Sequence, residues 1–172
     1  MNKRFALMLM PVLVACASER PTSETVPAAE PVRLVINEVY AHGGMDWFEI
    51  YNVGSGEVDL SQVSFFTREE SSPRRVSSDA FLEPNEFYYV PVRDFEIGVG
   101  LDDADEVTLI GIHGAVLDRV QWSSDSTVAD RSFGRFPDGA RALSILERPT
   151  PGDANEGPTH GLRVRSTWVA GR

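Results

Sequence analysis

The chain has little cysteine and lysine, and it has no long hydrophobic run. Among its 172 residues there is one cysteine, Cys16, and one lysine, Lys3. A single cysteine excludes a disulfide bond within the chain. The apolar stretch from Phe5 to Val14 is interrupted by Pro11 and is shorter than the about 20 residues that a membrane-spanning helix needs. These absences exclude a disulfide framework and a bilayer-spanning role for that stretch.

Histidine is also scarce, and the motifs of the common catalytic sites are missing. His42, His113 and His160 are scattered, without the HxxxH or HExxH spacing of zinc sites, and no phosphate-binding loop is present. His42 stands beside two glycines, His113 in an expected turn and His160 near the end of the chain. We therefore expect surface histidines, no catalytic residue, no cofactor and no enzymatic activity.

The start of the chain has the pattern expected of a short export signal. Lys3 and Arg4 form a basic start, the apolar stretch follows, and small Ala15 precedes Cys16. Leu13, Val14, Ala15 and Cys16 resemble the bacterial lipoprotein signal, in which the chain is cut between Ala15 and Cys16 and the thiol is acylated. The alternatives are an ordinary secretory signal with an incidental cysteine, or a buried N-terminal helix that carries a core thiol. The resemblance implies a mature chain that begins at Cys16, and Ala17, which is not aspartate, favours the outer membrane.

Composition divides the rest of the chain into three parts. Residues 16–31 are rich in proline and polar residues and predict a disordered tether. Residues 32–157 have the length of one domain, and residues 158–172 form a tail. Removal of residues 1–15 leaves 14 of the 16 basic residues against 26 acidic ones, a net charge of −12. Such a surface repels phosphate backbones and argues against nucleic-acid binding.

Short runs of β-type residues recur along the domain between turn residues, and no segment has a sustained helical period. Phe48 and Ile50 alternate with Trp47, Glu49 and Tyr51, which predicts a strand with one apolar face. His113 and Gly114 between two runs predict a tight hairpin turn. The pattern predicts an all-β sandwich or barrel with strands at 34–40, 47–51, 63–67, 87–92, 107–112, 116–122 and 142–146.

Several weak motifs occur in a fixed order along this domain. They are Ile36–Val39, Asp46–Asn52, Val58–Ser61, Asp105–Leu109, the pair Val120 and Trp122, Ser132–Gly139 and Pro149–Asn155. In this order they resemble the lamin tail domain of bacterial exported proteins. The resemblance implies an immunoglobulin-like β-sandwich that serves as an interaction or structural module, and fold alone does not assign an activity.

One position departs from the family pattern. After Leu60 and Ser61 the family usually has glycine and tryptophan, whereas Gln62 and Val63 stand here. The lost aromatic side chain leaves core space, for which Phe65 and Phe66 are the candidates.

Two groups of acids are the strongest candidates for chemistry. Glu38 and Glu49 lie on neighbouring predicted strands, where they form either the carboxylate pair of a glycosidase or, the reading we favour, sheet-surface acids paired with Arg135 or Arg33. A second group lies after two glycines and offers hard oxygen ligands for calcium, although a solvated loop without metal is favoured because EF-hand spacing is missing. This second group is Asp102, Asp103, Asp105 and Glu106.

Two segments of the chain carry clustered positive charge, one in a loop of the domain and one in the tail. Arg68, Arg74 and Arg75 form a small patch on a long loop, which we interpret as a solvated turn because no aromatic residues are interleaved. In the tail, residues 162–169 partly alternate and carry only positive charge, which fits an added edge strand in cis or docking on a partner's sheet, with pairing in cis or disorder favoured.

Taken together, the sequence predicts a lipid-anchored cell-envelope protein that displays a non-catalytic binding or structural module. Its expected partners are the membrane, through Cys16, and an envelope protein or a surface polymer, contacted through loop 68–79 or the face near Trp47. The alternative is a hydrolase or its accessory domain with a metal-binding acidic loop.

Overall fold

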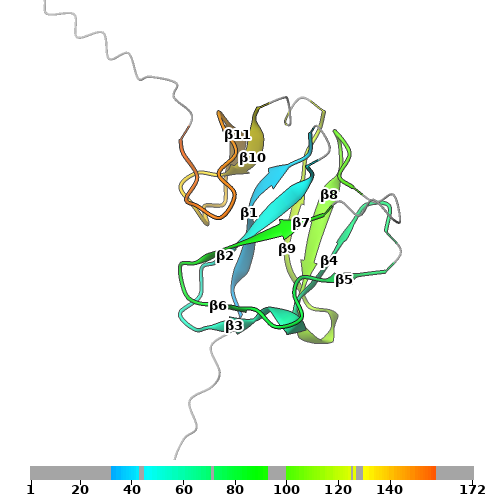
Figure 1. The fold of residues 1–172 in the computed structure, drawn as a ribbon, viewed down its shortest axis with the longest axis vertical. Coiled ribbons are helices and arrows are strands. Elements are labelled where there is room, and N and C mark those ends of the chain that lie inside the picture. The colour runs from blue at the N-terminus through cyan, green and yellow to red at the C-terminus, as the bar shows by residue number, and fades with distance from the viewer. Residues whose placement is uncertain are drawn as a thin grey trace, which may run out of the picture.

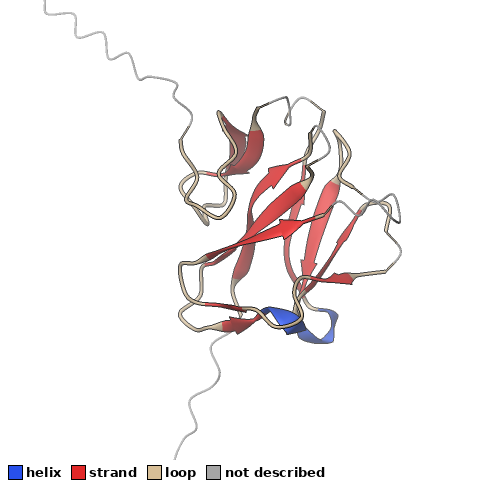
Figure 2. Ribbon diagram, in the orientation of Figure 1, coloured by secondary structure: helices blue, strands red, loops and turns tan. Residues whose placement is uncertain are grey.

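Strands with alternating apolar side chains build two antiparallel sheets with one apolar core between them (Figure 1). The computed structural model describes residues 32–42, 45–70, 72–92, 100–124, 126 and 130–157. Almost all regular structure within these ranges is strand, and the two short helical segments lie at one end of the sandwich (Figure 2). The expected all-β sandwich is confirmed.

The larger sheet has five strands and includes the first and the last strand of the described chain. Its order is β11-β10-β1-β2-β7, and every pairing is antiparallel. The strands are β1 (Leu34–Tyr40), β2 (Trp47–Asn52), β7 (Phe87–Pro91), β10 (Ser132–Arg135) and β11 (Leu143–Leu146).

The smaller sheet has four strands in the order β5-β4-β8-β9, and a separate two-stranded ribbon pairs β3 with β6. Short 3₁₀ turns follow β3 and connect β8 to β9. These elements are β3 (Val58–Asp59), η1 (Leu60–Gln62), β4 (Ser64–Thr67), β5 (Arg74–Arg75), β6 (Phe81–Leu82), β8 (Glu106–Ile110), η2 (Ile112–Gly114) and β9 (Val116–Gln121).

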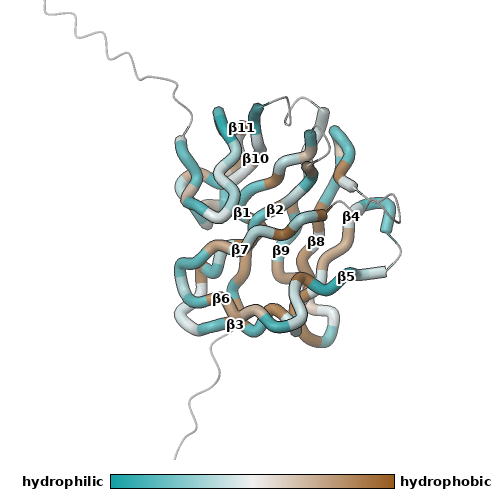
Figure 3. Tube along the Cα trace, viewed as in Figure 1, coloured by the Kyte–Doolittle hydropathy of each residue, from teal (hydrophilic) through white to brown (hydrophobic). Residues whose placement is uncertain are grey.

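The core lies between the two sheets, and apolar segments follow the facing strands (Figure 3). Ile36, Phe48 and Ile50 enter it from the larger sheet, while Phe65 and Leu109 enter it from the smaller one. The rings of Phe48 and Phe65 meet edge to face with centroids 4.8 Å apart, a preferred aromatic geometry. Of the two candidate phenylalanines, Phe65 is therefore the one in the core.

A β-bulge in β1 sets the outer face of the larger sheet. The register against β2 shifts between Ile36 and Glu38, so Asn37 is an extra residue. Ile36 and Val39 both keep their place in the core, while Asn37 and Glu38 turn to the outer face. Because Glu38 is paired with Glu49 in the register, the bulge places two acids side by side.

All seven predicted strands are present, with ends that differ by at most two residues. The predicted hairpin turn is confirmed, with φ of 62° at His113 and 77° at Gly114. Four strands were not predicted. Three of them, β3, β5 and β6, have two residues each, and β10 contains Gly134, which breaks its β-type pattern.

Candidate functional site

The acids of β1 and β2 lie against the outer face of the larger sheet, beneath residues 147–157, which we call the closing segment. Glu38 and Glu49 are fully buried, with 0% exposure each. The Ser132 hydroxyl donates a hydrogen bond to Glu38. Thr150 donates two more, from its backbone amide at 3.2 Å and from its hydroxyl at 2.9 Å. Glu38 is thus held by neutral donors from β10 and from the closing segment.

Glu49 is held in the same way. Its two carboxylate oxygens accept from the Asn37 side-chain amide at 3.2 Å and from the Gly152 backbone amide at 2.6 Å. Burial raises the pKa of Glu49 to about 8, against the smaller opposing effect of these hydrogen bonds, and the neighbouring Glu38 adds to the rise. Burial also raises the pKa of Glu38. Near neutral pH the pair therefore favours carrying a proton.

Two further residues connect the acids to the loop after β10. The Asn37 amide also donates to Asp138 at 2.9 Å, and its oxygen accepts from the Gly139 amide at 3.0 Å. Asn155 donates through its backbone amide to Asp138 at 3.0 Å and through its side chain to the Arg135 carbonyl at 2.8 Å. The acids thus belong to one network that spans β1, β2, β10 and the closing segment.

Close packing within this network requires a glycine on β10. A Cβ atom at Gly134 would lie 2.6 Å from the Asn37 backbone oxygen and 3.1 Å from the Asn155 side-chain nitrogen. Backbone atoms cannot yield at that distance without moving the strand. Gly134 therefore allows the closing segment to approach β1.

These contacts correct the interpretation of Glu38 and Glu49 as sheet-surface acids. The structure brings the two carboxylates together, but the closing segment covers them, and they accept hydrogen bonds from hydroxyls, an amide side chain and backbone amides. Arg135 pairs with Asp118 instead. The buried position also leaves no path by which a glycoside could reach the pair in this structure.

Arg135 itself joins the two sheets at one edge of the sandwich. Its Nη2 contacts Asp118 on β9 at 2.9 Å, and its Nε donates to the Ile36 carbonyl at 2.9 Å. The same Asp118 oxygen accepts from the Ile36 amide at 2.8 Å. Arg135 also donates to the Ala140 carbonyl. Together, Asp118 and Arg135 satisfy the backbone amide and carbonyl of Ile36. They do so on the side of β1 that faces β10, because β10 does not pair with β1 at Ile36.

Asp118 was missed in the sequence analysis, although a signal was present. Asp118 and Val120 alternate along β9, Trp122 follows the strand at the same spacing, and Val120 and Trp122 are buried. A charged residue in register with buried apolar ones indicates an inward-facing charge that needs a partner.

Aromatic side chains line the rest of the outer face. The ring of Trp47 stacks on Tyr40 with centroids 5.8 Å apart and lies 5.5 Å from Tyr89. Trp47 is 4% exposed, whereas Tyr89 is 41% exposed and the neighbouring Met45 is 70% exposed. The expected mixed aromatic and acidic face is confirmed, but Tyr89 and Met45, not Trp47, offer the accessible surface.

The acids of the 102–106 loop do not share a centre. Asp105 is buried, and its carboxylate accepts from the backbone amides of Glu106 at 2.7 Å and Arg68 at 3.2 Å. Glu106 opens β8 and pairs with Arg119 at 3.3 Å, while Asp102 and Asp103 are exposed. Within the described ranges, no group of three histidine, cysteine, aspartate or glutamate side chains is placed to hold a metal ion.

The basic patch is also dispersed. Arg74 lies on β5, where its guanidinium covers the Phe65 ring at 4.7 Å, contacts Glu70 at 2.6 Å and donates to the Val92 carbonyl. Arg68 donates to the Ala104 carbonyl, and Arg75 is exposed. The interpretation of a wholly solvated turn is therefore wrong for Arg74, which packs on the core.

Some predicted residues lie outside the described part of the chain. They are Ala15 and Cys16, the tether to residue 31, His160 and the rest of the tail 158–172. Among the described residues, His42 is half-buried and His113 is exposed. No helix in the described ranges has both the length and the apolar character needed to cross a bilayer.

Comparison with known proteins adds no assignment: the chain matches no family model, and no curated protein matches it.

Proposed function

We propose that the protein is a lipid-anchored component of the bacterial cell envelope. Cys16 follows a basic start, a short apolar stretch and a small residue, which supports acylation at this thiol. Two or more acyl chains give stable membrane attachment, whereas one chain gives reversible binding. Residues 16–31 would then separate the domain from the membrane, which we propose to be the outer membrane.

The domain on this anchor is proposed to be a lamin-tail-like module of the immunoglobulin-like type. The residues that carry the resemblance lie far apart in the sequence, yet Asn37, Glu38, Glu49, Ser132 and Asn155 meet in one hydrogen-bonded network. This convergence supports a structural role for the residues that make up these motifs. The acids serve to lock the closing segment onto the sheet, which favours a non-catalytic role.

The observation that carries a binding role is the aromatic row on the outer face. Tyr40, Trp47 and Tyr89 come from three adjacent strands and are in ring contact, with Tyr89 and Met45 exposed. Flat aromatic surfaces supply large contact area at low conformational cost. An envelope protein or a surface polymer is the partner that this face fits.

The anchor is tested by comparing the wild-type chain with Cys16→Ala in a bacterial host. We expect wild type in the membrane fraction, with the intact mass of an acylated chain that begins at Cys16. The variant should be soluble and unacylated. Recovery of both proteins as soluble, unmodified chains would contradict the anchor.

The aromatic face is tested with the unlipidated Cys16→Ala chain, so that membrane attachment does not mask binding. We expect this protein to co-sediment with isolated envelopes of the host and Tyr89→Ala to lower the bound fraction severalfold. Phe81→Ala is the matched control, because Phe81 is 58% exposed on β6. Equal loss in both variants, or no sedimentation of the parent chain, would count against the face.

A further inference from the structure

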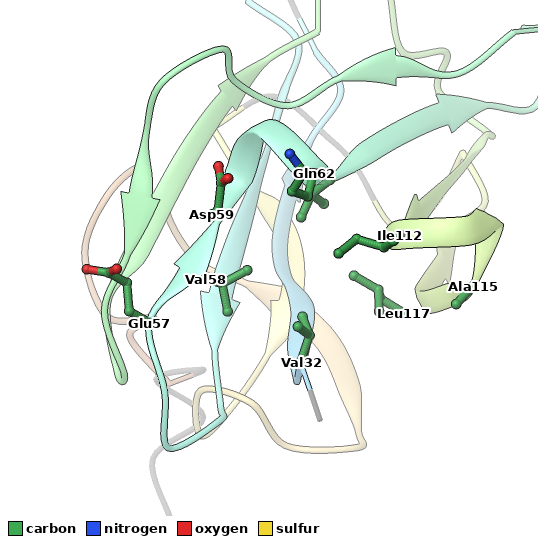
Figure 4. A pocket seen from close by; sticks show the side chains of 10 residues that line it. Val32, Glu57, Val58, Asp59, Gln62, Ile112, Ala115 and Leu117 are labelled. Carbon is green, nitrogen blue, oxygen red and sulfur yellow. The ribbon is translucent and has the colours of Figure 1, made fainter. Parts of the chain in front are cut away.

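The end of the sandwich at which the described chain begins carries exposed apolar side chains. Val32, the first described residue, is 44% exposed, and Ile112 and Val116 in the β8–β9 hairpin are 52% and 59% exposed. Val32 and Ile112 line an open groove of about 320 Å³ (Figure 4). The other apolar side chains of this groove are Val58, Val63, Ala115 and Leu117. We call Val32, hairpin segment 112–116 and the groove the apolar end. Apolar side chains gathered around an open concave site mark an interaction surface.

Charged side chains do not block the apolar end. From Ile110 to Leu117 the sequence has no aspartate, glutamate, lysine or arginine. Glu57 and Asp59 belong to the wall of the groove, but their carboxylates point away from it (Figure 4). Arg33, which follows Val32, is exposed and can meet a phosphate group. The apolar end therefore suits an apolar environment with phosphate groups at its border.

The hairpin turn also has few backbone groups left to satisfy. The Gly111 amide donates to the Ala115 carbonyl at 2.8 Å, and the Gly114 amide donates to the Gly111 carbonyl at 3.2 Å. A backbone group without a partner costs free energy when it leaves water. Because these groups already have partners within the turn, the turn can leave water at a lower cost than an open loop.

The position of the tether selects a membrane as the surface that this end meets. Residues 16–31 separate Cys16 from Val32, and a flexible chain of that length has a root-mean-square span of about 22 Å. A folded domain of this size has a radius of gyration of about 14 Å. The described chain begins at the end of the sandwich that carries β3, opposite β11 (Figure 1). A short tether therefore holds this end close to the bilayer, and attachment raises its local concentration there.

We propose that the apolar end rests on the bilayer that holds Cys16, with Val32, Ile112 and Val116 at the boundary between headgroups and acyl chains. Burial of apolar side chains at this boundary holds peripheral segments on membranes. The inference rests on the proposed lipid anchor. It gives the anchored domain one orientation, in which the closing segment faces away from the bilayer.

Hydrogen exchange on a lipid-coupled chain tests this orientation. The mature chain, residues 16–172, has Cys16 as its only thiol, so a maleimide-bearing phosphatidylethanolamine can be coupled there and placed in phosphatidylcholine vesicles. The reference is the same chain blocked with N-ethylmaleimide, in buffer without vesicles. We expect amides 111–117 to exchange about threefold more slowly on the vesicles, because contact with the bilayer opposes local opening of the hairpin. Because the coupling is chemical, the result does not depend on acylation by the host, and failure of the anchor appears only in the fractionation test.

Two aspartate variants separate the apolar end from other exposed apolar side chains. Val116→Asp should abolish the slower exchange, because it places a charge at the boundary. Ile145→Asp is the matched control and should keep it, because Ile145 is 39% exposed on β11 and does not line the groove. Exchange of the core amides 107–109 reports that each variant is folded. Equal exchange on vesicles and in the reference, or equal loss in both variants, would overturn the inference.

Two other occupants of the apolar end would give their own results, and each overturns the inference. Exchange at 111–117 that slows with protein concentration in the blocked chain would mean that a second copy covers this end. Exchange there that becomes faster after deletion of residues 26–31 from the blocked chain would mean that the tether covers it.

Discussion

Arg135→Ala is expected to lower the free energy of unfolding by about 3 to 5 kcal/mol, because removal of one partner of a buried ion pair leaves the other charge uncompensated. Asp118 would then be without its guanidinium in a mostly buried place. The Ile36, Ala140 and Arg141 carbonyls would each lose a donor as well. Arg135→Lys should recover only part of the loss, since an ammonium cannot reach these acceptors as a planar fork.

Urea unfolding of purified Arg135→Ala at neutral pH measures the loss. Arg141→Ala is the matched control, because Arg141 is an exposed arginine six positions away and its backbone carbonyl remains in the variant. We expect the control to change stability by less than about 0.5 kcal/mol, as surface substitutions usually do. A similar small change for Arg135→Ala would mean that the ion pair does not hold the sandwich edge.

Stability is expected to fall as the pH rises from 5 to 9, which is the opposite of the trend that a salt-bridged carboxylate produces. Burial holds the pKa of Glu49 at about 8 in the folded chain, against 4.5 for the unperturbed group. Between these values the unfolded chain has lost a proton that the folded chain keeps, so rising pH favours unfolding by about 1.4 kcal/mol per pH unit. The full change is on the order of 5 kcal/mol, complete above the folded pKa and absent below the unfolded one. Glu38 acts in the same direction.

Chemical denaturation across this pH range, repeated with Glu49→Gln, measures the effect. The variant has no carboxyl group to ionise at this position, so its unfolding free energy should change much less between pH 5 and 9. Asp153→Asn is the control, because Asp153 is an exposed acid in the closing segment. It should keep the wild-type slope. A slope that is unchanged in Glu49→Gln would show that this carboxyl group is not the source.

The strands and the hairpin were predictable because their signals are local. Phe48 and Ile50 alternate with polar or aromatic neighbours, and that alternation alone fixes which side chains face the core. His113 and Gly114 similarly adopt the positive φ that a tight two-residue hairpin turn requires. Strands of two residues, such as β3 and β6, are too short to show a period. They form because their neighbours in space offer hydrogen bonds.

The burial of Glu38 and Glu49 was not predictable from the same pattern. Alternation places Glu49 on the face away from the core, but it would place Glu38 with Ile36, and only the bulge at Asn37 brings Glu38 to the outer face. That face is usually solvated in an antiparallel sheet. The closing segment covers them: Thr150 lies 112 residues beyond Glu38 in the sequence, and Gly152 lies 103 residues beyond Glu49. A pattern within one strand carries no information about such a segment. The motif Pro149–Asn155 indicated that these residues matter, but it did not indicate which side chains they contact.

The closing segment also determines when the domain can finish folding. As the chain emerges from the ribosome, β1 and β2 appear first and present Glu38 and Glu49 to water as ordinary ionised acids. The last of their partners, Thr150 and Gly152, arrive only with the closing segment. The fold is therefore completed by long-range contacts that form late, which are characteristic of slow folding. A nascent chain therefore remains incompletely folded until nearly all of its domain has been made.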